Sequence, residues 1–197
     1  QGVNGLTHLR VAYRPESTTR PGGYGLASLR AKTEVLLFLD QAPGKTFYQV
    51  RSFYDVVSSK HPSFKNELKE IGQTSALLED RLKNLKGTDA DKRALTASLL
   101  VLKYREMARP KVKEVPIDRE ESRLILRALL ESDWKQKGRS YPLTPRYAFS
   151  ILGINAKDGF NQPKNYRELE TVAKKWLKEN LDKYVIKRRV PVERKKK

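Results

Sequence analysis

The sequence contains no cysteine, which excludes disulfides, cysteine-based zinc sites and thiol catalysis. This absence fits a reducing intracellular compartment. The sequence has two histidines, His8 and His61, and they are far apart, so a histidine-rich metal site is not expected either. We therefore expect neither a metal nor any other cofactor.

Long apolar runs are also missing. The longest, residues 35–39, is far too short to cross a bilayer, and the N-terminus does not resemble a signal peptide. We expect a soluble protein of the cytoplasm, nucleoid or nucleus. The chain begins with Gln1 rather than Met, which is compatible with processing or trimming. If the start is processed, an organelle matrix is an alternative location.

Acidic residues are scarce relative to basic ones. The chain has 41 Lys and Arg against 23 Asp and Glu, a formal net charge of +18 over 197 residues. Such an imbalance costs stability through self-repulsion, so a polyanionic partner is its most direct explanation. We expect this partner to be nucleic acid, with duplex DNA favoured over RNA.

Apolar residues recur at helical spacing along most of the chain, which predicts a mainly α-helical protein. Ser63, Thr88, Asp118 and Asn165 are placed to act as N-caps. The helical segments are expected at about 26–42, 46–60, 63–71, 74–86, 88–109, 118–137, 147–152 and 165–184. The expected organisation is a flexible basic arm (1–24), a first helical domain (25–110), a linker (111–117), a second helical domain (118–186) and a disordered basic tail (187–197).

A basic-then-aliphatic pattern at residues 29–39 is followed by a turn at Pro43-Gly44, a second helical segment and the sequence His61-Pro62-Ser63-Phe64-Lys65-Asn66. This order resembles the first three helices of winged-helix and helix-turn-helix DNA-binding domains. The resemblance covers residues 26–72 and implies that the third helix enters the major groove. It assigns base contacts to Ser63, Lys65, Asn66 and Lys69, and phosphate contacts to Lys60 and His61. The long second segment and a leucine-rich helix in place of the β-wing depart from those families.

Two further groups of basic residues are candidates for phosphate contact. One group surrounds the end of the 88–109 helix and continues into the linker: Lys103, Arg105, Arg109, Lys111 and Lys113. Cations at a helix C-terminus also stabilise the helix dipole, so a structural role is the alternative for this group. The other group lies in the tail: Lys187, Arg188, Arg189, Arg194, Lys195, Lys196 and Lys197. Nuclear targeting or solubility is the alternative for the tail.

Aromatic residues alternate with basic ones at 139–141, 146–147 and 164–167. Stacking on unpaired bases is one interpretation of this pattern. Because Tyr147 and Phe149 also lie in an apolar stretch, packing in the core is the favoured interpretation.

No motif in the sequence indicates catalysis. The Pro-Gly-Lys-Thr sequence at 43–46 lacks the leading glycine and the spacing of a phosphate-binding P-loop, and acidic pairs such as Glu120-Glu121 fall on expected helix surfaces. We therefore expect a non-enzymatic DNA-binding protein of transcription, replication, segregation or packaging, with a homo-oligomer or larger assembly as an option. An RNA-binding component of a ribonucleoprotein, such as a ribosomal protein, is one alternative. An adaptor or matrix-like protein that binds acidic partners or anionic membrane is the other.

Overall fold

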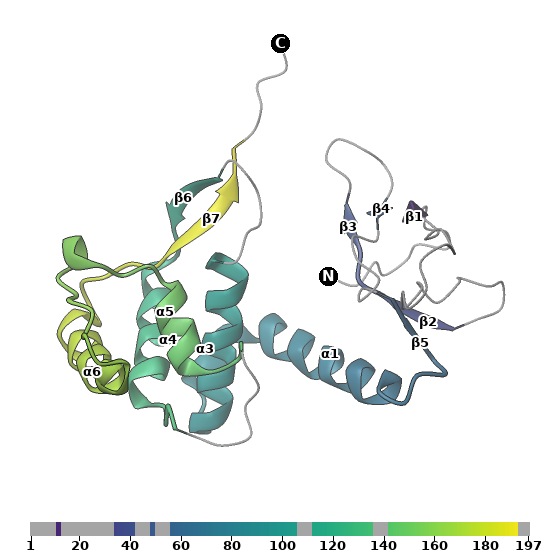
Figure 1. Cartoon of the computed structure of the whole chain (residues 1–197), viewed down its shortest axis with the longest axis horizontal. Helices are drawn as coiled ribbons and strands as arrows, with labels where there is room; N and C mark the ends of the chain where they lie inside the picture. The colour runs from purple at the N-terminus through teal and green to yellow at the C-terminus, as the bar shows by residue number, and fades with distance from the viewer. Residues whose placement is uncertain are drawn as a thin grey trace, which may run out of the picture. The chain divides into compact units, whose positions relative to one another are not determined.

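The computed structural model describes residues 11–12, 34–41, 48–49, 56–105, 112–135 and 142–192. The chain divides into two compact units, residues 1–75 and 76–197. Figure 1 labels the helices and strands along the chain. The described part is mainly helical, as predicted, and none of its helices has the length and apolar character needed to span a membrane.

The described residues of the first unit contain short strands. The strands β1 (Val11–Ala12), β4 (Tyr48–Gln49) and β3 (Asp40–Gln41) form a sheet in that order, with β1 parallel to β4. A second sheet pairs β2 (Val35–Leu37) antiparallel with β5 (Val56–Ser58), with Leu36 opposite Val57.

These strands correct the predictions for residues 26–42 and 46–60. Both segments were expected to be helices, but Val35–Leu37 and Val56–Ser58 are strands paired with each other. A short apolar run fits the interior of a helix and of a strand equally well, and β-branched valines favour the strand. The expected helix-turn-helix unit depends on both helices and is not confirmed.

The helix α1 (Phe64–Glu79) begins directly after Ser63, as predicted, but it does not end near Ile71. It continues through Gly72, and α2 (Arg81–Lys86) follows after a single residue. The α3 helix (Ala90–Arg105) is capped by Asp89, whose Oδ1 accepts a hydrogen bond from the backbone N–H of Lys92 at 2.9 Å. Asp89 therefore takes the capping role predicted for Thr88.

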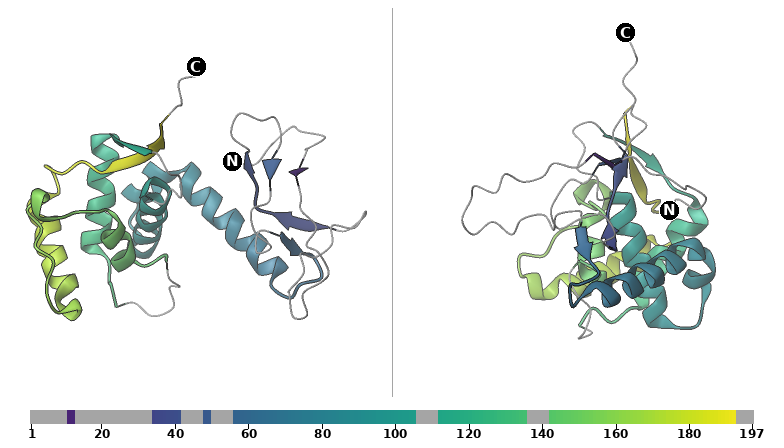
Figure 2. Two further views of the ribbon diagram at one scale, coloured as in Figure 1. Left: turned by 45° about the horizontal axis from the view of Figure 1, so that its top comes forward. Right: turned by 90° about the vertical axis from the view of Figure 1, so that its right-hand side faces the viewer.

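The second unit is built from helices around one core. Its longest helix, α3, packs against α4 (Arg119–Glu131) and α5 (Pro145–Ile151), and α4 in turn packs against α6 (Leu169–Asn180). Figure 2 gives two further views of these helices. Two short 3₁₀ turns, η2 (Ala156–Asp158) and η3 (Tyr166–Glu168), lie between α5 and α6.

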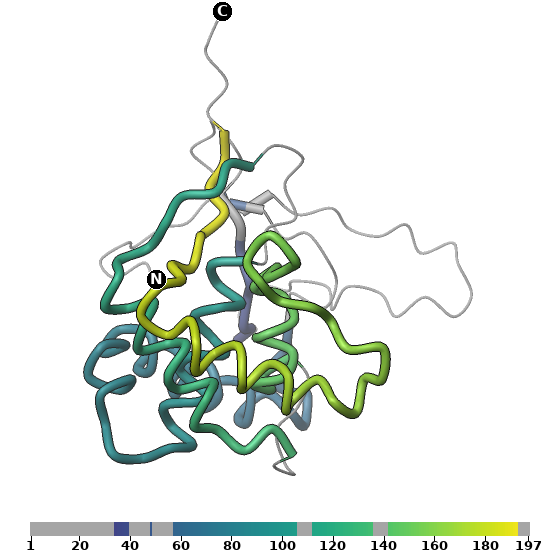
Figure 3. Tube along the Cα trace, turned by 90° about the vertical axis from the view of Figure 1, so that its left-hand side faces the viewer, coloured from purple at the N-terminus to yellow at the C-terminus, as the bar shows by residue number. Residues whose placement is uncertain are grey.

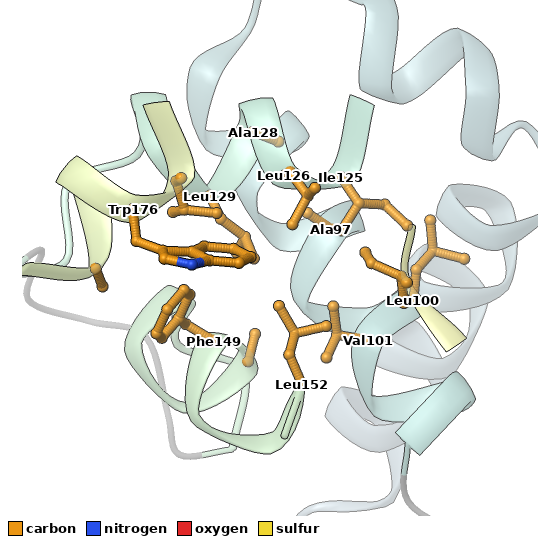
Figure 4. Close-up of a cluster of buried hydrophobic side chains, with 14 of the residues drawn as sticks. Ala97, Leu100, Val101, Ile125, Leu126, Ala128, Leu129, Phe149, Leu152 and Trp176 are labelled. Carbon is orange, nitrogen blue, oxygen red and sulfur yellow. The ribbon is translucent and has the colours of Figure 1, made fainter. Parts of the chain in front are cut away.

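Buried side chains of α3, α4, α5 and α6 meet in this core, as Figure 4 shows. Leu100 and Val101 of α3 and Ile125 and Leu129 of α4 are all fully buried in it. The other labelled side chains include Phe149, Leu152 and Trp176. The periodicity of the sequence predicts the inward faces of α4 and α6, where apolar residues recur at spacings of three and four. In α3 the expected face of Leu95, Leu99 and Leu102 is only half-buried, and Ala94, Ala97, Leu100 and Val101 form the inward face instead.

Local capping sequences set the starts of the later helices. The Asp118 carboxylate accepts from the N–H of Glu121 at 2.9 Å, which confirms the predicted cap of α4. The Asn165 side chain accepts from the N–H of Arg167 at 3.0 Å, so Asn165 caps η3, the turn that leads into α6, rather than α6 itself. Thr144 caps α5 in the same way, with Pro145 in the first helical position.

Residues expected to be a linker and a disordered tail instead form a two-stranded ribbon. The strand β6 (Val112–Pro116) pairs antiparallel with β7 (Lys187–Pro191), with Glu114 opposite Arg189 and Val115 opposite Arg188. The two strands run side by side in Figure 3. Both predictions are wrong at these residues, and the chain divides near residue 75 rather than at 111–117.

Candidate nucleic-acid interface

The ribbon is fastened to the end of α3 by Arg105. A two-stranded ribbon alone is marginal in water, so its support decides whether it is formed. The guanidinium of Arg105 is 6% exposed; its Nη1 donates to Glu114 Oε1 at 2.7 Å and to the carbonyl of Lys187 at 3.1 Å. In return, Arg189 Nη1 donates to the carbonyl of Arg105 at 3.0 Å. One arginine therefore bonds to both strands.

The same arginine also reaches the end of α5, because its Nε donates to the carbonyl of Ile151 at 3.1 Å. Three segments that are distant in the sequence thus share one buried cation. The expected phosphate contact of Arg105 is not compatible with this burial. Arg105 therefore has a structural role, which was the alternative to phosphate contact for this group of basic residues. Its bonds are tertiary contacts, however, and not the interaction with the helix dipole that the sequence suggested.

The loop after α5 is shaped to leave room for this guanidinium. Gly153 has φ of 76°, in the left-handed region, and a Cβ at this position would lie 2.7 Å from Arg105 Nη2. Replacing Gly153 with Ala is expected to destabilise the second unit by about 2 kcal/mol or more, from left-handed strain together with the displaced arginine. Urea unfolding followed by circular dichroism measures this loss.

A matched control separates the two causes. Gly159 has nearly the same φ, 75°, but no atom lies within 4 Å of the position of its Cβ. Gly159→Ala should therefore show the backbone strain alone, about 1 kcal/mol. Equal losses in the two variants would contradict the steric role of Arg105 at Gly153.

A second polar network lies next to β7. Tyr104 Oη donates to Glu121 Oε1 at 2.6 Å, and Arg81 Nε donates to the same oxygen at 2.9 Å. Burial and the hydrogen bond to Glu121 raise the pKa of Tyr104 to about 12, while the positive charges of Arg81 and, to a smaller extent, Arg188 act in the opposite direction. The buried carboxylate of Glu121 is thus neutralised from α2, and Arg188 is near enough to affect the phenol.

The pairing of the strands decides which side chains share a face. Directly opposite residues lie on one face, so Glu114 and Arg189 share the face that meets Arg105, and Lys113 and Arg188 lie on the other. Lys187, opposite Pro116, is on the same face as Glu114. Glu114, the single acidic residue of the two strands, is bonded to Arg105 and lies 3.9 Å from Arg189 Nε. The negative charge of Glu114 is therefore already neutralised by these two arginines.

Three cations of the ribbon remain exposed, and none of them forms an ion pair with another described residue: Lys113, Lys187 and Arg188. We call these three residues the basic ribbon. Exposed cations without a carboxylate partner keep their full attraction for an external anion, because no internal pair competes for them. The basic ribbon unites one cation from the expected linker with two from the expected tail.

The remaining predicted contacts are placed less favourably. Lys60, His61, Lys65, Asn66 and Lys69 are exposed at or near the start of α1, but Glu67 and Glu70 lie among them. The Ser63 hydroxyl donates to Glu67 Oε1 at 2.5 Å and lies 2.7 Å from His61 Nδ1, so it is occupied within its own turn. Lys103 is exposed on the last turn of α3. Arg109, Lys111, Arg194, Lys195, Lys196 and Lys197 lie outside the described residues.

An open hollow of about 370 Å³ lies in the first unit, lined by Phe38, Glu67, Glu70, Ile71, Thr74 and Ser75. Its two carboxylates make it unsuitable for a phosphate. Within the described ranges, no group of three or more His, Asp or Glu side chains is arranged to hold a metal ion.

Comparison with known proteins gives no further guidance: no protein-family model, no curated protein and no solved structure matches the chain. The functional argument therefore depends on the residues themselves.

Proposed function

We propose that this protein binds duplex DNA without catalysing a reaction, and that the basic ribbon contacts the phosphate backbone. The observation that carries the proposal is the joining of Lys113 with Lys187 and Arg188 on one supported ribbon, where the only acid, Glu114, is already paired. Each Lys or Arg that meets a phosphate releases condensed counterions, which favours binding without any base preference.

The shape of the ribbon favours duplex DNA over duplex RNA. The major groove of B-DNA is wide enough to admit a two-stranded β-ribbon, whereas the major groove of A-form RNA is deep and narrow. Arg105 holds β6 and β7 in a fixed register, so the three cations are placed before binding. In the sequence, Val192 and Glu193 follow β7 and are followed by the basic run Arg194, Lys195, Lys196 and Lys197, which adds further positive charge to this end of the chain.

The test is the salt dependence of binding to a duplex of mixed sequence. The triple variant Lys113→Gln, Lys187→Gln, Arg188→Gln is expected to lower the slope of log K against log salt by about 2.7, because each lost phosphate contact removes about 0.9. Fluorescence anisotropy of a labelled duplex at several salt concentrations measures this slope. Full-length protein is used throughout.

A control variant removes the same charge from the opposite end of the helices. Lys92 lies in the first turn of α3, about 20 Å along the helix axis from Arg105. Lys135 follows the far end of α4, and Lys175 is adjacent to Lys174, whose Nζ donates to the carbonyl of Ser132. All three lysines are exposed. Replacing these three with Gln should leave the slope close to that of the unchanged protein.

Three results would overturn the proposal. Absence of duplex binding at low salt would end it. Equal loss of slope in the ribbon and control variants would assign binding to net charge rather than to the ribbon. Tighter binding to a structured RNA hairpin than to the duplex would replace DNA with RNA as the partner.

A further inference from the structure

One aromatic ring of the second unit stands outside its core. Phe149, Phe160 and Trp176 are buried and contact one another, whereas Tyr166 is 58% exposed. The guanidinium carbon of Arg146 lies 5.0 Å from the centroid of the Tyr166 ring. Core packing, the favoured interpretation of the aromatic residues in the sequence, therefore does not apply to Tyr166.

Both partners of this contact are held by secondary structure. Tyr166 begins η3, where the Asn165 side chain accepts from the N–H of Arg167 and the Asn165 carbonyl accepts from the N–H of Glu168. Arg146 belongs to α5, which Thr144 caps. The ring and the guanidinium are consequently positioned in advance, which reduces the entropy lost when a ligand binds.

The residues near Tyr166 in the sequence are mainly basic. Lys164 and Arg167 lie within two residues of Tyr166 and are exposed, and neither forms an ion pair with a residue in the described ranges. The one acid of this turn, Glu168, accepts from the Asn165 side chain at 3.5 Å. Arginine stacked on an aromatic ring keeps its in-plane N–H groups free to donate to a phosphate. A ring surface next to several cations matches the two parts of a nucleotide, an aromatic base and an anionic phosphate.

We propose that Tyr166 is a stacking site for an unpaired base, and that Arg146, Lys164 and Arg167 contact the phosphates on either side of that base. This inference rests on the proposed function and names a second site, which takes an unpaired stretch of the DNA rather than the duplex. The two sites lie at opposite ends of α5, since Ile151 bonds to Arg105 beneath the ribbon and Arg146 contacts Tyr166. The helix is seven residues long, or about 10 Å, so one rigid element links them.

The test compares two single-stranded probes that carry the same phosphates: a thymidine 12-mer and an abasic 12-mer. The unchanged protein is expected to bind the thymidine probe at least about fivefold more tightly, which is the effect of stacking one base. Tyr166→Leu should bind both probes equally, whereas Tyr166→Phe, which keeps the ring, should retain the preference. Affinity for the abasic probe should be the same in all three proteins.

Phe38→Leu provides a matched control. Phe38 is also exposed, at 43%, but it lies with Glu67 and Glu70 around the hollow of the first unit, where a phosphate would be repelled. This variant should keep the thymidine preference. If the contact between Arg146 and Tyr166 is purely structural, Tyr166→Leu should have a lower unfolding midpoint and still prefer the thymidine probe over the abasic probe. That outcome would overturn the stacking site.

The two proposals fail in different ways. If the unchanged protein binds the duplex with a ribbon-dependent salt slope but does not prefer thymidine over abasic DNA, the stacking site is wrong and the proposed function stands. If neither duplex nor single strand binds at low salt, both are wrong.

Discussion

Replacing Arg105 with Met is expected to lower the free energy of unfolding of the second unit by about 3 kcal/mol. The substitution keeps much of the side-chain volume but removes the bonds to the carbonyls of Ile151 and Lys187 and to the carboxylate of Glu114. Breaking a buried charged network by removing one partner typically costs about 3 to 5 kcal/mol. The lower end applies because Glu114 is 42% exposed and water can replace part of its lost pairing.

Urea unfolding followed by far-ultraviolet circular dichroism measures this loss. Two variants show whether the cost belongs to the network. Arg105→Lys keeps the charge, but its single compact ammonium cannot take the positions of both Nε and Nη1, so it should recover only a small part of the lost stability. Glu114→Gln removes a partly exposed partner and should cost about 1 kcal/mol. An unfolding midpoint of Arg105→Met equal to that of the unchanged protein would refute the role of Arg105 as the joint between ribbon and helices.

Arg105→Met also bears on DNA binding. If Arg105 positions the basic ribbon, its loss should lower the salt slope for duplex binding even under conditions where the protein remains folded, although Arg105 itself does not face solvent. The basic side chains Lys113, Lys187 and Arg188 would be present but no longer held in one register. A structural role limited to the helices would leave that slope unchanged.

The sequence predicts the helical second unit well because its signals are local. The caps at Asp118 and Asn165 need only the next two or three residues, and the inward faces of α4 and α6 repeat at helical spacing. In α3 the larger leucines Leu95, Leu99 and Leu102 suggested the wrong face, because small residues such as Ala94 and Ala97 allow close packing there. The short strands at residues 35–37 and 56–58 carry no such signal, since three apolar residues fit either structure. This ambiguity also produced the expectation of a helix-turn-helix unit.

The ribbon could not be predicted for a different reason. Its two strands are separated by residues 117–186, so the residues near either strand give no information about the partner. Arg105 has the sequence pattern of an ordinary cation at a helix C-terminus, and only the tertiary contacts show that it is buried. The candidate site thus combines basic groups that the sequence identifies separately, and the fold brings them together on one ribbon.

Replacing Trp176 with Ala is expected to cost about 3 to 5 kcal/mol, a large part of the roughly 5 to 15 kcal/mol that stabilises a typical domain. The indole is 4% exposed and lies edge-on to Phe149, Phe160 and Tyr184, with ring centroids 6.2, 6.3 and 5.2 Å away. Its removal leaves a cavity that the surrounding helices cannot easily close, because α6 is also held to α4 by the core.

The indole also makes a polar contact that a smaller aromatic residue cannot replace. Trp176 Nε1 donates to the carbonyl of Asp158 at 2.8 Å, which ties η2 to α6. Trp176→Phe keeps part of the ring volume but leaves this carbonyl without its donor, so we expect a loss of about 2 kcal/mol, smaller than for Ala. Urea unfolding followed by the fluorescence of the remaining Trp134 measures both losses. Equal midpoints for Trp176→Ala and the unchanged protein would show that the aromatic cluster is not the centre of the core, whereas equal losses for Ala and Phe would assign the cost to the hydrogen bond rather than to packing.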